Sequence, residues 1–284
     1  MSEGPDGMFI LARLPGVAAA KRDRSGGGSR AGPGGWDAEG VSEQQLSIRF
    51  DPQLWLFLPP RRRRAEARPA PWDGTSSLGH VVQSLGVPLT ETGTLTVDGR
   101  PALPSQRPPA GATVDVPAVR RPQALPLSPP RFLLDVHLGS LARRLRLVGV
   151  SARYSNDADD PDLVDLANEE GRILLTQDHG LLKRRNLHLG AYVRGSRPDD
   201  QLADVLERFA PPLAPWTRCT ACDGPLVPVD KAEIAQQLRP GTRRTYDTFA
   251  RCSSCGRPYW HGAHTRHLEA VVDAAARVSA RSTG

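Results

Sequence analysis

Apolar and polar positions form their most regular pattern between residues 131 and 212. Apolar runs that predict short strands lie at 131–136, 152–155, 172–178 and 190–194. The segments between and after them, 138–149, 157–171 and 198–210, carry apolar residues at the spacing of one helix face, such as Leu138, Leu141, Ala142, Leu145 and Val148. In 138–149, Arg143, Arg144 and Arg146 are expected to lie away from that apolar stripe. Strands that alternate with helices predict an α/β domain built on a parallel sheet.

A weaker pattern at 44–118 predicts a small α+β domain. The order is an alternating strand in QLSIRFD, a helix in SSLGHVVQSLGV, a strand in GTLTVDGRPA that enters an Asp-Gly turn, and a last strand in GATVDVPA. This order resembles the ubiquitin-like fold of sulfur carriers. Those carriers act through a free C-terminal Gly-Gly, whereas here the unit continues into VRRPQALPLSPP, so we expect no conjugation chemistry.

Three segments outside these patterns have simpler expectations. Residues 1–43 are rich in Gly and lack periodicity, which is typical of a disordered leader. Residues 119–130 are rich in Pro and predict a semi-stiff linker. The four arginines of 61–64 interrupt the ubiquitin-like unit, either as a solvated loop or as a contact with RNA phosphate.

Composition adds a preference about partners and compartment. The formal net charge is +6, and the basic residues are nearly all Arg, whose planar fork suits phosphate. This favours a nucleic acid partner, although a general bias towards Arg gives the same charge. No apolar stretch approaches the about 20 residues of a membrane span, and no basic segment precedes an apolar one as in a signal peptide. We therefore expect a cytoplasmic protein without a membrane partner.

Three aspartates stand where strands or helices of the α/β domain end or begin. Asp135 and Asp178 end two predicted strands, and Asp160 is the expected cap of a helix whose first residue is Pro161. Ligands of such sheets bind beyond the carboxyl ends of the strands, so these carboxylates should converge there. Converging carboxylates repel one another unless a cation lies between them, and hard oxygen ligands suit Mg²⁺ or Mn²⁺. Helix capping by Asp160 and Asp178 is the alternative.

The same segments resemble a known family. FLLDVHLGSLARRLRLVGV, DDPDLVDLANEEGRILLTQDHGLL and DDQLADVLERF are similar to the C-terminal RNase domain family named after the Mut-seven exonuclease, a PIN-like nuclease with an appended zinc ribbon and often a preceding ubiquitin-like domain. The resemblance covers roughly 130–268. It implies that Asp135, Asp160 and Asp178 are metal ligands and that Thr176 lies beside them. It also implies a fourth acid, for which Asp157, Asp159 and Asp162 are candidates.

Two Cys-x-x-Cys pairs follow the α/β domain. Cys219 and Cys222 form the first pair, and Cys252 and Cys255 form the second. Four thiolates fit a closed tetrahedral Zn²⁺ site, so we expect a structural zinc ribbon over 213–268 and a helical tail over 269–284. Three histidines, His261, His264 and His267, suggest either a second metal or ordinary surface residues. The aromatic pair Tyr259 and Trp260 either stacks on a base or packs the ribbon on the nuclease domain.

Together these patterns predict a metal-dependent ribonuclease. The domains expected are a ubiquitin-like domain at 44–118, a PIN-like nuclease domain at 131–212 and a zinc ribbon at 213–268. Substrate contacts are expected from five residues near the acids: Thr176, Arg143, Arg144, Lys183 and Arg184. The alternatives are a non-catalytic RNA-binding protein with the same fold and an adaptor that binds a protein partner through the ubiquitin-like domain.

Overall fold

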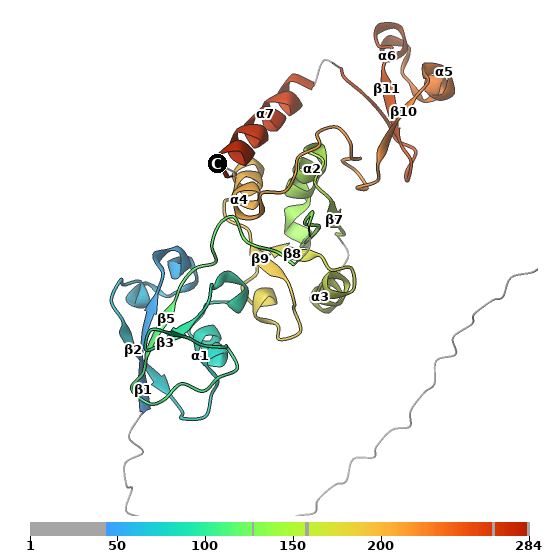
Figure 1. Cartoon of the computed structure of the whole chain (residues 1–284). Coiled ribbons are helices and arrows are strands. Elements are labelled where there is room, and N and C mark those ends of the chain that lie inside the picture. The colour runs from blue at the N-terminus through green and yellow to red at the C-terminus, as the bar shows by residue number, and fades with distance from the viewer. Residues whose placement is uncertain (1–43, 127, 157–158, 263–264, 283–284) are drawn as a thin grey trace, which may run out of the picture. The chain divides into compact units, whose positions relative to one another are not determined.

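The computed structural model describes residues 44–126, 128–156, 159–262 and 265–282 (Figure 1). The expected disordered leader, residues 1–43, lies outside the described residues, as does the acid candidate Asp157. No helix in the described part of the chain is long and apolar enough to cross a membrane.

A four-stranded parallel sheet forms the centre of the second half of the chain. Its strand order is β7-β6-β8-β9, with bounds β6 Phe132–Leu134, β7 Ala152–Tyr154, β8 Ile173–Thr176 and β9 Gly190–Tyr192. All neighbouring strands pair in parallel, and Leu134 lies opposite both Tyr154 and Leu175. The predicted α/β alternation with a parallel sheet is confirmed.

Helices cover both faces of this sheet because its strands are apolar on both sides. Phe132 and Leu134 of β6 belong to a core with α2, α4 and α7, whereas Leu133 between them packs against α3. Figure 1 shows α7 beside α4 and α2, and Val271, Ala275 and Val278 of α7 complete the first core. The helix bounds are α2 Gly139–Leu147, α3 Asp160–Glu169, α4 Pro198–Phe209 and α7 Thr265–Ser282.

Two segments differ from the expected helices. The helix expected after Asp178 is only a 3₁₀ turn, η5 Leu181–Lys183, and the chain becomes extended at Arg184. Helix α7 begins at Thr265, inside the segment assigned to the ribbon, because its apolar residues pack on α4 as one continuous 18-residue helix.

The ubiquitin-like unit is a five-stranded sheet with the order β2-β1-β5-β3-β4 and one main helix. Its elements are β1 Gln44–Phe50, β2 Arg68–Trp72, α1 Leu78–Ser84, β3 Thr96–Val97, β4 Arg100–Pro101 and β5 Thr113–Val116. The strand β2 was not predicted, because Pro69 and Pro71 are unusual within a strand. It is an edge strand, where a residue without a backbone N–H is tolerated.

A buried ion pair joins the ubiquitin-like unit to α4. Glu91 ends the 3₁₀ turn η3 Leu89–Glu91, and its carboxylate accepts two hydrogen bonds of 2.9 and 2.8 Å from Nη1 of Arg208. The two residues are only 2% and 1% exposed. Arg208 also donates to Thr90 O at 3.0 Å and to Gln123 Oε1 at 2.9 Å, and Glu91 accepts from the Tyr192 amide at 2.8 Å. Both charges are therefore supported by several partners.

The Pro-rich segment that was expected to form a semi-stiff linker lies against α4. Arg121 donates to Asp204 Oδ1 at 2.6 Å, and the Gln123 amide donates to Arg208 O at 2.6 Å. These bonds fix the segment between the two folds, which proline content alone does not predict.

The cysteine region is a three-stranded antiparallel sheet in the order β10-β11-β12. Its elements are β10 Leu226–Val229, α5 Lys231–Ile234, α6 Pro240–Thr245, β11 Phe249–Cys252 and β12 Pro258–Trp260. Only Ile234, Leu238 and Phe249 form its buried apolar cluster. So small a core gives this part little stability of its own.

Removal of one partner of the buried ion pair should destabilise the whole chain. We expect Glu91→Ala to lower the free energy of unfolding by about 3–5 kcal/mol, because Arg208 would remain charged and buried. Urea denaturation followed by circular dichroism measures this. The matched control is Asp247→Ala, which breaks the exposed Lys231–Asp247 pair and should cost less than about 1 kcal/mol. Equal effects of the two variants would contradict the importance assigned to the buried pair.

Candidate functional site

An open hollow of about 540 Å³ lies at the carboxyl ends of β6 and β8. It is lined by Asp135, Val136, His137, Asp160, Gln177, Asp178 and His179. The topology of the parallel sheet explains this meeting, because the segments that follow β6 and β8 leave the sheet at the same edge. The three acids singled out from the sequence thus line one hollow.

Asp135 is held in place by Thr176. Asp135 is 6% exposed, and its Oδ2 accepts a hydrogen bond of 2.6 Å from Thr176 Oγ1. The same hydroxyl accepts from the Asp178 amide at 2.9 Å. Thr176 is itself completely buried, and its hydroxyl connects two of the acids. Its expected contact with a substrate stays a prediction.

Asp160 lies one position further into the helix than expected. The N-cap of α3 is Asp159, whose side chain accepts from the Asp162 amide at 3.0 Å, and Asp160 is the first helical residue. Because Asp160 does not cap the helix, its carboxylate can pair with a side chain instead. Its Oδ2 lies 3.2 Å from Nη2 of Arg184, in a partly exposed pair of the kind that contributes little to stability.

Asp178 both lines the hollow and caps a turn. Its Oδ1 accepts from the amides of Gly180 and Leu181 at 2.6 and 3.2 Å. The capping alternative is therefore realised, but it occupies one oxygen only. Among the described residues, Oδ1 of Asp135, Oδ1 of Asp160 and Oδ2 of Asp178 accept no hydrogen bond. Each acid thus keeps one oxygen for another ligand.

Two histidines of the hollow were missed from the sequence. His137 and His179 line it, and His179 directly follows Asp178, which is the one signal that pointed to it. Burial, followed by the nearby Lys183 charge, lowers the pKa of His179. The His179 ring also packs against Phe57 at 4.8 Å and Tyr192 at 5.1 Å between centroids. The ubiquitin-like unit therefore contacts the rim of the hollow.

The four expected basic contacts do not line the hollow itself. Arg184 reaches its edge through Asp160. Arg143 donates to Ser140 Oγ, and Nε of Arg144 lies 2.5 Å from Oδ1 of Asp199 on α4. Lys183 is partly buried near His179. Of the four, Arg184 is the one that an ion pair holds at the acids.

The four cysteines form a second candidate site. All four sulfur atoms lie within 4.8 Å of one another, with Cys219 and Cys255 at 3.7 Å and Cys222 and Cys252 at 3.5 Å. Disulfide sulfurs would be about 2 Å apart, whereas ligands of tetrahedral Zn²⁺ at about 2.3 Å lie about 3.8 Å from each other. The thiols are free. The arrangement fits a closed tetrahedral metal site.

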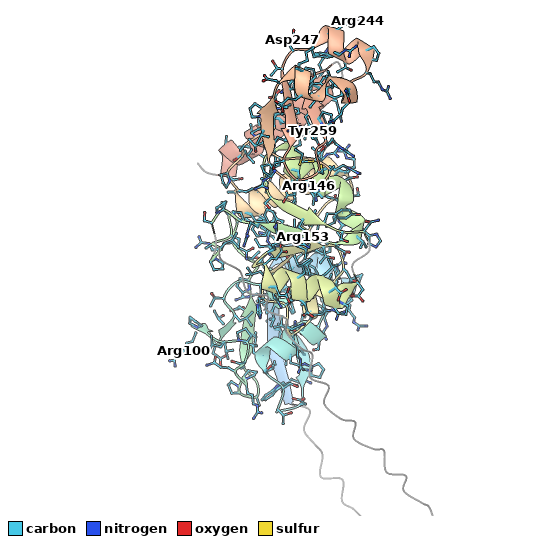
Figure 2. All side chains as sticks on the ribbon, turned by 90° about the vertical axis from the view of Figure 1, so that its right-hand side faces the viewer. Arg100, Arg146, Arg153, Arg244, Asp247 and Tyr259 are labelled. Atoms are coloured by element: carbon cyan, nitrogen blue, oxygen red, sulfur yellow. The ribbon has the colours of Figure 1, made fainter. Side chains whose placement is uncertain are left out.

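Two side chains labelled in Figure 2, Tyr259 and Arg146, contact residues of the cysteine region. The Tyr259 hydroxyl lies 3.0 Å from Cys219 Sγ. Burial alone would raise the pKa of the Cys219 thiol, but hydrogen bonds from Tyr259 and from nearby backbone amides lower it to about 6. Tyr259 is thus engaged within the ribbon, whereas Trp260 is 38% exposed.

Arg146 attaches the cysteine region to the α/β domain. It donates to the carbonyls of Thr220 and Ala221 at 3.1 and 2.8 Å and to Ala152 O at 2.7 Å. Arg146 is only 4% exposed, which its expected place away from the apolar stripe does not predict. It is buried because the first cysteine turn covers that part of α2 and supplies carbonyl acceptors.

A second metal site at the histidines gains no support in the part of the chain that the structure describes. Within it, the four cysteines are the only group of metal-ligating side chains that meets in so small a volume. The His261 ring packs on Trp216 at 4.8 Å, and His267 lies in a separate apolar groove between α4 and α7. His264 lies outside the described residues.

Comparison with known proteins identifies two regions. A family model described as Mut7-C RNAse domain matches residues 130–272, and one described as Mut7-C ubiquitin matches residues 43–124. No curated protein and no solved structure matches the chain.

Loss of one thiol should unfold the cysteine region selectively. A metal site of this type contributes roughly 10–16 kcal/mol of apparent binding energy to folding, and the apolar cluster here is small. We expect Cys222→Ser to bind no metal and to lose amide protection across 217–262 while the parallel sheet stays protected. Hydrogen exchange and elemental analysis measure both effects.

The matched control is Ser253→Ala, which changes a residue between two ligands without removing a thiol. It should retain one equivalent of metal per chain. An ordered cysteine region in metal-free protein would contradict the prediction.

Proposed function

The chain belongs to the Mut7-C RNAse domain family, and on that premise we propose that it is a metal-dependent ribonuclease with a PIN-like nuclease domain. The observation that carries the proposal is the hollow lined by Asp135, Asp160 and Asp178 at the carboxyl ends of β6 and β8. Three carboxylates in one hollow, beside backbone turns and an arginine, suit a phosphodiester substrate better than a small apolar ligand.

By its chemistry the donor set suits Mg²⁺ or Mn²⁺, although the oxygens of the three carboxylates do not all lie within 4.8 Å of one another, so they would have to move closer to bind one ion together. Each of the three carboxylates keeps one oxygen without a hydrogen bond among the described residues. Such hard oxygen ligands, with water completing the shell, are those that Mg²⁺ uses next to phosphates. A metal bound there supplies a lowered pKa for water and neutralises charge on the phosphate oxygens.

The protein's own residues prepare the site in three ways. Thr176 orients Asp135 by donating to Oδ2, which leaves Oδ1 without a hydrogen bond among the described residues. The same hydroxyl fixes the backbone at Asp178. Arg184 forms a partly exposed pair with Asp160, so an entering phosphate oxygen can compete for its guanidinium. We assign no general base.

We further propose that the cysteine cluster holds a structural Zn²⁺. Four thiolates leave no coordination position for water, so the metal would stabilise the ribbon without taking part in cleavage. Tyr259 and Arg146 would act as outer supports of the cluster. Free thiols suit a reducing compartment, and we place the protein in the cytoplasm.

The acidic residues should be required for cleavage but not for folding. We expect Asp135→Asn to reduce cleavage of single-stranded RNA in Mn²⁺ by on the order of 10²-fold or more, because an amide is a poor ligand for a hard cation. The measurement is the initial rate on labelled RNA, with thermal unfolding as a check of structure. The non-catalytic RNA-binding alternative predicts no metal-dependent cleavage by the wild-type chain.

The matched control is Asp165→Asn. It removes the same charge from the exposed face of α3, away from the hollow, and should leave the rate unchanged. A folded Asp135→Asn chain that cuts RNA as fast as this control would place the site elsewhere.

The role of Thr176 is tested by two substitutions. Thr176→Val keeps the shape and removes the hydroxyl, and we expect the Mn²⁺ affinity to fall about 10–100-fold, as is usual when a supporting hydrogen bond to a ligand is lost. Thr176→Ser keeps the hydroxyl and should stay within a few-fold of wild type. Titration of the rate with Mn²⁺ distinguishes them, and equal Mn²⁺ dependence of both variants would refute the positioning role.

A further inference from the structure

A cluster of arginines in the ubiquitin-like unit has no role in the site described above. Arg61, Arg62, Arg64 and Arg68, together with Pro69, surround an open hollow of about 320 Å³. The cluster begins inside the 3₁₀ turn η2 Pro60–Arg62, which comes after η1 Pro52–Phe57, and it ends at the first two residues of β2. The turn η2 and the start of the edge strand β2 thus bring the four guanidinium groups around one hollow on the surface.

These four arginines have no acidic partner within the described part of the chain. No carboxylate there lies within 4.0 Å of their guanidinium groups, and Glu66, the one acid in the same segment, pairs with none of them. Arg63 does not line the hollow, and its Nε donates to Leu58 O at 2.9 Å. Arg64 does line it, and one of its guanidinium nitrogens, Nη1, donates to Arg63 O at 2.9 Å. Four like charges around one hollow repel one another, and a bound anion relieves that repulsion.

The cluster is connected to the rim of the acidic hollow by a short piece of chain. Phe57 packs against His179 and Tyr192, with ring centroids 4.8 and 5.2 Å apart, and Arg194 donates to Gln53 O at 3.2 Å. Arg61 follows Phe57 by four residues, so their Cα atoms are at most about 14 Å apart.

We propose that Arg61, Arg62, Arg64 and Arg68 form a docking surface for the phosphate backbone of single-stranded RNA whose neighbouring segment enters the acidic hollow. The entry of the RNA into the acidic hollow rests on the proposed ribonuclease function. The lining has no large apolar side chain. Protein interfaces need an apolar centre and membrane-bound surfaces need an apolar anchor, whereas phosphates need only the charge and the donor forks of arginine.

The experiment measures binding separately from cleavage. The full chain carries Asp135→Asn so that RNA stays intact, and the anisotropy of a fluorescein-labelled single-stranded RNA of mixed sequence is followed at increasing NaCl. We expect the added substitutions Arg61→Gln, Arg62→Gln, Arg64→Gln and Arg68→Gln to raise Kd more than 10-fold. The slope of the logarithm of the association constant against the logarithm of the NaCl concentration should become less negative by up to about 3, because each lost phosphate contact removes about 0.7 from its magnitude.

The control removes the same charge elsewhere. Arg100→Gln, Arg107→Gln, Arg277→Gln and Arg281→Gln change four exposed arginines outside both hollows and should keep the wild-type slope. If the four-fold docking variant does not fold, the pair Arg61→Gln and Arg64→Gln replaces it, with an expected fall in slope of about 1.4.

Two results would overturn the proposal. One is a folded docking variant that binds RNA with the same Kd and slope as the control variant. The other is a docking variant that no longer binds phosphatidylserine vesicles but still binds RNA as tightly as the control variant does. Failure of the proposed function looks different, because a wild-type chain that never cleaves RNA would still show arginine-dependent RNA binding if the docking surface is correct.

Discussion

A buried guanidinium must satisfy its charge and its hydrogen bonds inside the protein, and at Arg208 this requirement joins several parts of the chain. Its partners come from η3 of the ubiquitin-like unit, which supplies Thr90 O and the Glu91 carboxylate, and from Gln123 in the following segment. Glu91 in turn accepts a hydrogen bond from the Tyr192 amide of β9. β9 pairs with β8, and β8 carries Thr176. The hydrogen bonds of Glu91, the pairing of β9 with β8 and the Thr176 hydroxyl thus form one connected series from the ubiquitin-like unit to the acidic hollow.

The acidic hollow and the cysteine cluster also each depend on the hydrogen bonds of one buried polar group. Thr176 uses its single hydroxyl as donor to Asp135 and as acceptor from the Asp178 amide, so two acids from different segments keep a fixed relation. Arg146 uses a buried guanidinium to collect carbonyls from the first cysteine turn. In each case one polar group, completely or nearly buried, sets the relation between elements that local sequence does not connect.

The sequence was sufficient where a feature depends on neighbours along the chain. Alternating apolar runs predicted the parallel sheet, and the spacing of the cysteines predicted their meeting. Asp135 and Asp178 were found because they end apolar strands. The identity of the N-cap, Asp159 and not Asp160, was missed because two adjacent aspartates offer the same chemistry and only backbone angles choose between them.

Features that depend on distant contacts were not predictable. Glu91 and Arg208 are 117 residues apart in the chain, and each looks like an ordinary polar surface residue in its own segment. Arg146 is buried by a cysteine turn whose carbonyl acceptors lie 74 and 75 residues farther along the chain. β2 was missed because its two prolines argue against a strand unless the edge position is known.

The junction at Arg208 also limits how this architecture can be rearranged in evolution. Exchange of the first domain by recombination near residue 119 would cut between Glu91 and Gln123, both of which hold the same guanidinium. A new N-terminal neighbour would have to bring its own carboxylate to that point, or Arg208 would have to change in the same lineage. Exchange of the first fold alone would therefore leave a buried guanidinium without its carboxylate, even though each fold has its own sheet and core.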